Sequence, residues 1–140
     1  MKLMGFNFTK INAEKYKDQV DSIKIDQKIN ILEMNSSKQK ILASKDDFLD
    51  IKFNYEIVYS PDFAKITFEG KLLLAIDSNK IKEILKSWEE KIISEDFKVG
   101  IFNVILKKSN IKAIQFEDEL GLPLHLPMPS LKRQVAQEKE

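Results

Sequence analysis

Apolar side chains recur at every second position through the first half of the chain, as they do in strands that bury one face. The clearest run extends from Leu49 to Tyr59, where apolar or aromatic residues hold the odd positions and mostly polar residues hold the even ones. A strand buried on one side only is typical of an antiparallel sheet. Three further runs have the same period, and their apolar positions are Met4, Phe6 and Phe8; Ile23, Ile25, Ile29 and Ile31; and Ile66, Phe68, Leu72, Leu74 and Ile76.

Irregularities in these runs predict local features of the strands. The alternation changes phase near Thr9 and again at Leu32, which predicts a bulge or a strand end at each place. Gly70 is in register with the apolar face of its strand, so it marks either a bulge or a close approach of neighbouring atoms. Turn-forming residues at 60–62 predict a hairpin between the third and fourth strands. Residues 35–47 are polar and predict a mobile loop.

The apolar period changes from 2 to about 3.6 after residue 77, which indicates helices. Asp77 or Ser78 can cap the first helix, and Ser94 can cap the second. We expect a break in the second helix at Ser109-Asn110 and a C-terminal stop at Gly121. The apolar stripes of the two helices are Ile81, Ile84, Leu85, Trp88 and Ile92, and then Phe97, Ile101, Val104, Ile105, Ile111, Ile114 and Leu120.

A segment rich in leucine and proline follows Gly121. Its prolines, at positions 123, 127 and 129, exclude helix and central strand and predict an extended chain. The polar residues 132–140 predict a frayed tail. We therefore expect a single α+β domain over residues 1–131. It comprises a four-stranded antiparallel sheet, two C-terminal helices packed on one face, and a Leu/Pro-rich extended closing segment.

Composition narrows the class of protein. The 140 residues are 43% hydrophobic, which suits a domain with a real core. Lys and Arg number 23 against 22 Asp and Glu, and a net charge of +1 gives no general attraction to nucleic acid or anionic membranes. The chain has no cysteine, which excludes disulfides and thiolate metal sites and fits a cytoplasmic protein. No apolar run is long enough to cross a bilayer, and the first residues do not resemble a signal peptide.

Candidate catalytic chemistry is sparse, and we expect neither an enzyme nor a cofactor or metal site. His125 is the single histidine, and its sequence neighbours are leucines, so packing or surface exposure is its expected role. The four glycines are too scattered for a phosphate-binding loop, and no Gly-x-Ser-x-Gly motif is present. Clustered acids such as Glu117 to Glu119 are typical of a solvated face.

Two places carry apolar residues beyond what a simple core needs. Leu73 and Ala75 interrupt the polar face of the fourth strand, and Val58 does the same on the third. The closing segment places Leu122, Leu124, Leu126 and Met128 at a spacing of two. The segment either covers the fold's own core or forms one wall of an apolar groove or subunit contact. On the groove interpretation, the client-binding residues are Val58, Leu73, Ala75, Leu122, Leu124, Leu126 and Met128.

The order of elements resembles the SecB-like protein-export chaperones. The resemblance covers residues 4–131. It rests on the opening strand from Gly5 to Glu14, the central hairpin of 49–59 and 66–76, and the closing segment from Gly121 to Pro129. In that family a four-stranded antiparallel sheet packs beside a short and a long helix. Its members hold unfolded chains in apolar grooves and assemble as dimers of dimers. The family's glycine–aromatic pair late in the hairpin is replaced here by Leu73 and Leu74, and its acidic surface is not evident.

The resemblance implies an ATP-independent holdase that binds unfolded or extended polypeptide, has a link to protein export and assembles as a dimer or tetramer. The alternative is a ribosome- or RNA-associated accessory protein without catalytic activity. Exposed lysines and the Lys132-Arg133 pair favour this alternative, and aromatic residues on a sheet can stack on bases. However, Phe53, Tyr55 and Tyr59 share a face with aliphatic residues, so we expect them in the core.

Overall fold

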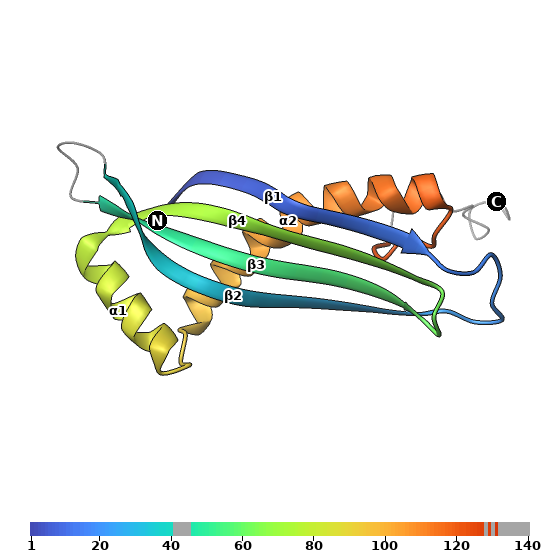
Figure 1. The fold of residues 1–140 in the computed structure, drawn as a ribbon, viewed down its shortest axis with the longest axis horizontal. Helices are drawn as coiled ribbons and strands as arrows, with labels where there is room; N and C mark the ends of the chain where they lie inside the picture. The colour runs from blue at the N-terminus through green and yellow to red at the C-terminus, as the bar shows by residue number, and fades with distance from the viewer. Residues whose placement is uncertain (41–45, 128, 130, 132–140) are drawn as a thin grey trace, which may run out of the picture.

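Four antiparallel strands and two helices form the protein in the computed structural model, which describes residues 1–40, 46–127, 129 and 131. The strands are β1 (Lys2–Lys15), β2 (Lys24–Lys40), β3 (Asp46–Ser60) and β4 (Ala64–Asp77), and they lie in the order β1-β4-β3-β2. The helices α1 (Ser78–Glu89) and α2 (Glu95–Leu120) follow. The predicted α+β class, with a four-stranded antiparallel sheet followed by two helices, is confirmed (Figure 1).

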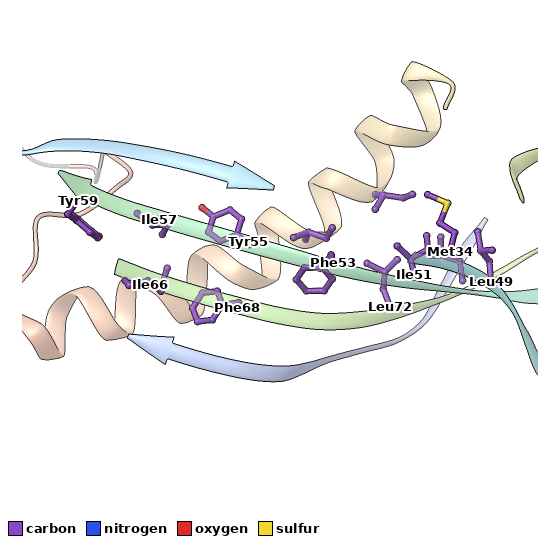
Figure 2. Close-up of a cluster of buried hydrophobic side chains, with 14 of the residues drawn as sticks. Met34, Leu49, Ile51, Phe53, Tyr55, Ile57, Tyr59, Ile66, Phe68 and Leu72 are labelled. Carbon is purple, nitrogen blue, oxygen red and sulfur yellow. The ribbon is translucent and has the colours of Figure 1, made fainter. Parts of the chain in front are cut away.

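One face of the sheet, here called the inner face, carries the core and faces α2. On β3 the inner face consists of the odd residues from Leu49 to Tyr59, all of which have no exposed surface. They pair with inner residues of β4 such as Leu74, opposite Leu49, and Phe68, opposite Tyr55. Figure 2 shows these side chains between the two central strands and the helix. The aromatic strand is therefore buried as predicted, because a central strand covered by a helix must be apolar on that side.

The predicted irregularities lie where the alternation changes phase. The β1–β4 register shifts between Phe8 and Lys10, and the β2–β3 register shifts between Ile31 and Glu33. Gly70 is a close approach: a Cβ atom there would lie 2.7 Å from the carbonyl oxygen of Asn7 and 2.7 Å from Cζ of Phe53. A glycine is required at this position because β1 and a buried ring meet over it.

The helix ends are capped as the sequence predicts. The Asp77 carboxylate accepts from the Asn79 amide at 2.9 Å, and the Ser94 hydroxyl accepts from the Phe97 amide at 3.3 Å. Gly121 ends α2 in the left-handed conformation, with φ of 64°. The predicted break at Ser109 is wrong, since α2 is continuous over 26 residues. Ser109 lies in the buried stripe of the helix, where its small side chain suits close packing.

The predicted loop over residues 35–47 is shorter than expected. β2 continues to Lys40 and β3 begins at Asp46, with Asn35 opposite Asp50 and Ser36 opposite Leu49. Polar residues can extend a hairpin because its ladder is made by backbone groups. Residues 41–45, 128, 130 and 132–140 lie outside the described part of the chain, and so does the predicted polar tail.

α2 crosses the inner face obliquely. It begins on the β2 side of the sheet near α1 and reaches the β1 side at its C-terminal end (Figure 1). Residues 122–127, here called the strap, then turn back from Gly121, and Leu122 is buried in the core. Neither described helix has the length and apolar character needed to cross a bilayer. Because α2 crosses the sheet obliquely, it leaves the β1 half of the inner face less covered near α1.

Candidate functional site

A buried polar cluster joins α2, the strap and the sheet. At its centre the Glu117 carboxylate accepts hydrogen bonds from the Tyr59 hydroxyl and from the His125 amide, the latter at 3.0 Å. The His125 ring lies between this carboxylate, with Nδ1 2.8 Å from Oε1, and Asn110, with Nε2 2.8 Å from Oδ1. The side chains of Glu117 and His125 have no exposed surface. Such a buried acid is tolerated because its oxygens are satisfied by several donors.

The cluster extends to β2 through Tyr55. Its hydroxyl lies 2.9 Å from Oε1 of Gln27 and 3.2 Å from Oδ1 of Asn110, and its single proton can be donated to one of them at a time. Burial raises the pKa of the Tyr55 and Tyr59 hydroxyls well above their usual value. The hydrogen bond from Tyr59 to Glu117 and the charge of that carboxylate raise the Tyr59 pKa further. Both tyrosines therefore act as protonated donors at neutral pH.

The structure corrects the expected surroundings of His125. The sequence placed it among leucines, whereas its ring contacts an acid. Gly121 reverses the chain direction, so Glu117 and His125, each four residues from that glycine, come side by side. The cluster presents no open cleft to a substrate, because the acid and the histidine are sealed and their hydroxyl partners are tyrosines held as donors. Its geometry fastens the strap, and we assign it no reaction.

An apolar row on β1 forms a partly exposed edge of the inner face. It consists of Leu3, Phe6, Phe8 and Ile11, which lie opposite β4 residues from Leu74 to Phe68. Leu3 and Ile11 are 38% and 44% exposed, and the two phenylalanines are partly buried. Six residue steps on β4 at about 3.3 Å each make the row about 20 Å long. This length matches about six residues of an extended polypeptide.

The two phenylalanine rings of the row pack against aromatic rings of the core. The Phe6 ring lies 5.3 Å from the Phe53 ring, and the Phe8 ring lies 5.2 Å from that of Phe68. Phe6 and Phe8 meet edge to face at 5.2 Å. Because Phe53 and Phe68 have no exposed surface, the outer rings rest on the buried core and are held in place.

A pocket of about 440 Å³ lies beyond the Leu3 end of the row. It is formed where the end of β4 meets α1 and the start of α2. Ala75, Ile76, Ile84 and Phe97 provide its apolar walls, and the polar part of its lining consists of Asp77, Lys80, Glu83, Ser94 and Asp96. Met1 also lines it and lies over α2, where a Cβ atom on Gly100 would be 3.3 Å from the Met1 Cε atom. An exposed methionine can adapt to differently shaped apolar groups.

The predicted client-binding residues lie at separate places. Ala75 lines the 440 Å³ pocket, whereas Leu73 lines a smaller pocket of about 180 Å³ with Asn7 and Asp50. Val58 lies on the outer face, the side of the sheet away from α2, where it pairs with Lys65. Tyr59, which bonds to Glu117 beside the strap, pairs with Ala64 on β4. Ala75 lies eleven residues further along β4, so it is about 36 Å from the strap end of the sheet. The structure thus does not bring strand end and closing segment into one groove.

The strap leucines differ among themselves. Leu122 is buried, Leu126 is half-buried and Leu124 is 39% exposed, while Met128 lies outside the described residues. The residue that points inward in the middle of the strap is His125, whose ring is held between α2 residues. Alternation of apolar residues therefore did not indicate which side of the strap faces the core, because a polar contact determines its orientation.

Comparison with solved structures finds three matching chains, and one of them belongs to a SecB-like chaperone. The Mycobacterium tuberculosis SecB-like chaperone Rv1957, in complex with a ChAD peptide from the HigA1 antitoxin, aligns over 96% of this chain and 92% of its own, with 12% identity and a TM-score of 0.49. No protein-family model and no curated protein sequence matches the chain.

The β1 row was not identified as a site from the sequence, where its residues indicated only a strand. The missing information was the sheet order, which makes β1 an edge strand. Because α2 crosses the sheet obliquely and covers this edge strand only in part, the inner side chains of β1 are partly exposed to solvent. Among the residues that the structure describes, no group of three or more His, Cys, Asp or Glu side chains is placed to hold a metal ion.

Proposed function

We propose that the protein is an ATP-independent holdase that binds extended apolar segments of unfolded polypeptides along the β1 row. The observation that carries this proposal is the partial exposure of Leu3, Phe6, Phe8 and Ile11, an apolar row that lies beside the buried inner residues of β4. Monomeric soluble proteins rarely leave contiguous apolar surface open, and such a surface usually marks an interaction site.

The chemistry of the row suits clients of varied sequence. Aromatic and aliphatic side chains bind apolar residues without demanding hydrogen bonds at fixed positions, so selectivity is modest. The adjoining pocket has room for a large client side chain, and Met1 at its rim is 69% exposed. β1 is also an edge strand, and its backbone can pair with an extended client strand.

The charges on the outer face argue against the RNA-associated alternative. Lys28 lies opposite Glu56 and Lys10 lies opposite Glu69, and Lys65 is 3.7 Å from Glu56. Interleaved charges of opposite sign do not produce the uniform positive potential that nucleic-acid backbones require. The lysines of this face are therefore those of an ordinary solvated sheet.

Oligomerisation is part of the same proposal. The buried stripe of α2 contains Ile101, Ile105 and Ala113, yet Val99 and Ile111 of the same helix are 51% and 61% exposed. A helix with apolar residues outside its buried stripe suits a second contact. Light scattering at micromolar concentration should give a dimer or larger species, and a strict monomer would contradict this part. A cytoplasmic location stays a prediction from the amino-acid composition, and a link to export stays a prediction from the family resemblance.

Aggregation of a denatured enzyme, followed by light scattering, tests the function. The protein should suppress aggregation at stoichiometric amounts without ATP. Leu3→Asp should weaken suppression, because a charge in the row must lose water when an apolar client binds. Ile92→Asp is the matched control, since Ile92 is 66% exposed and lies outside both the row and the pocket. Leu73→Asp and Leu124→Asp test the client-binding residues predicted from sequence.

Folding of each variant is checked first by circular dichroism. The proposal is refuted if the folded wild type leaves aggregation unchanged at a several-fold molar excess. Equal loss of suppression in Leu3→Asp and Ile92→Asp would move the client site away from the β1 row.

A further inference from the structure

The strap is fastened to the rest of the protein mainly through one residue. The carbonyl oxygen of His125 accepts from Nε2 of Gln27 on β2 at 3.4 Å, its amide donates to Glu117, and its ring contacts Glu117 and Asn110. Among the described strap residues, the other hydrogen bond comes from the Leu122 amide to the Glu117 carbonyl oxygen, at 2.8 Å, and belongs to the end of α2. Beyond Leu122, His125 therefore supplies the hydrogen bonds that hold the strap.

Apolar contact adds little to this attachment beyond Leu122. Leu124 is 39% exposed, and Leu126 is half-buried. The two prolines of the strap lack amide hydrogens and cannot bond to the sheet. A segment held by a polar contact, and attached through a left-handed glycine, can leave without dismantling the core beneath Leu122.

The strap lies across the inner face where α2 has moved away from β2. Gln27, which reaches the strap, occupies an inner position of β2 between Ile25 and Ile29, both half-buried. Its partner in the cluster, Tyr55, connects this part of β2 to the core. Removal of the strap would therefore open a second apolar strip on the same face as the β1 row.

We propose that the strap is a releasable latch, an extended Leu/Pro segment of the chain itself that occupies part of the inner face until an extended apolar client displaces it. This inference rests on the proposed function and specifies its regulation. An internal occupant lowers the apparent affinity by the fraction of molecules in which the site is free. When the strap leaves, water can reach Glu117, so the acid is not left buried without partners.

Two variants and a matched control test the latch. His125→Ala removes both ring contacts, and Asn110→Ala removes one of them and keeps the acid–histidine contact. Asn103→Ala is the control, because Asn103 is an exposed asparagine of the same helix. The first readout is hydrogen exchange of the residue-125 amide by NMR without client. We expect exchange about 10-fold faster in His125→Ala, a smaller rise in Asn110→Ala and no change in the control.

The second readout is the affinity for a permanently unfolded, carboxymethylated protein as the client probe. We expect it to tighten by about 10-fold in His125→Ala and by less in Asn110→Ala. The latch is disproved if exchange at residue 125 does not rise, or if it rises while affinity is unchanged or weaker. Absence of binding in the wild type and every variant would instead reject the holdase function. If His125→Ala does not fold, Asn110→Ala decides the question, since it keeps the contact of His125 with Glu117.

Discussion

Replacing Gly70 by alanine should destabilise the protein, because the added methyl group has no space. The Cβ atom would lie 2.7 Å from the carbonyl oxygen of Asn7 and 2.7 and 2.8 Å from Cζ and Cε1 of Phe53. The first neighbour is backbone of the paired strand β1. The second is a ring packed against Phe6 and Phe8 at centroid distances of 5.3 and 6.4 Å. Overpacking of this kind costs about 1–3 kcal/mol.

Whether Gly70→Ala raises or lowers the stability of the fold depends on two opposing free-energy contributions. Alanine restricts the unfolded chain more than glycine and stabilises by about 0.4–1 kcal/mol where it fits. The steric term is larger, so Gly70→Ala should lose about 1–2 kcal/mol, or roughly 3–8 °C in Tm. Gly5→Ala is the matched control in a neighbouring strand, because its Cβ atom would lie 3.8 Å from Cβ of Leu73. We expect that variant to be neutral or slightly more stable.

Urea unfolding followed by circular dichroism measures both variants. Adding Phe53→Leu to Gly70→Ala removes the ring atoms that clash, and the pair should show a favourable coupling of about 0.5–3 kcal/mol. Wild-type stability in Gly70→Ala, or an equal loss in Gly5→Ala, would refute the close-approach reasoning.

Three further predictions concern α2 and the buried cluster. Gly121→Ala should cost about 1 kcal/mol, because φ of 64° is strained for a residue with a Cβ atom; urea unfolding checks this, and no loss would contradict it. Ser109→Ala should leave stability unchanged or raise it by up to about 1 kcal/mol, since the buried hydroxyl has no hydrogen-bond partner; a clear loss in thermal unfolding would reveal one. Stability should fall as pH rises past about 10, because burial raises the Tyr55 and Tyr59 pKa above the unfolded value, so the unfolded chain loses these protons first. Urea midpoints across alkaline pH measure the effect. In Tyr59→Phe the fall should be shallower by up to about 1.4 kcal/mol per pH unit, and an unchanged slope would rule out this cause.

Periodicity predicted the strands and helices because burial of one side produces a regular spacing of apolar residues in the sequence. The phase changes at Thr9 and Leu32 located the register shifts within a residue or two, since an extra residue in one strand must displace its alternation. Strand pairing through backbone hydrogen bonds is harder to predict, because it does not require a pattern of side chains. Residues 35–40 extend β2 although their side chains are polar, because the ladder that holds them is made by amide and carbonyl groups.

The client-binding residues predicted from the sequence stay a prediction, and the structure places them apart from one another. Ala75 does line a pocket, but Val58 and the strap lie elsewhere on the sheet. The exposed β1 row depends on which strand forms the edge and on the oblique path of α2, and neither is encoded in a local pattern. Leu3 and Leu74 pair across strands more than seventy positions apart, so the row exists only once the sheet has formed.

The sequence by itself determined the α+β class, the strand irregularities, the helix caps and the glycines at 70 and 121, because each depends on local geometry or one-sided burial. Only the tertiary structure decided what surrounds His125. Glu117 and Asn110 of α2 and Gln27 of β2 bond to it, and two tyrosines of β3 bond in turn to these residues. Local sequence shows leucines beside this histidine. Folding places a buried acid there, because Gly121 reverses the chain and a sealed carboxylate must be satisfied by whichever donors the sheet and strap provide.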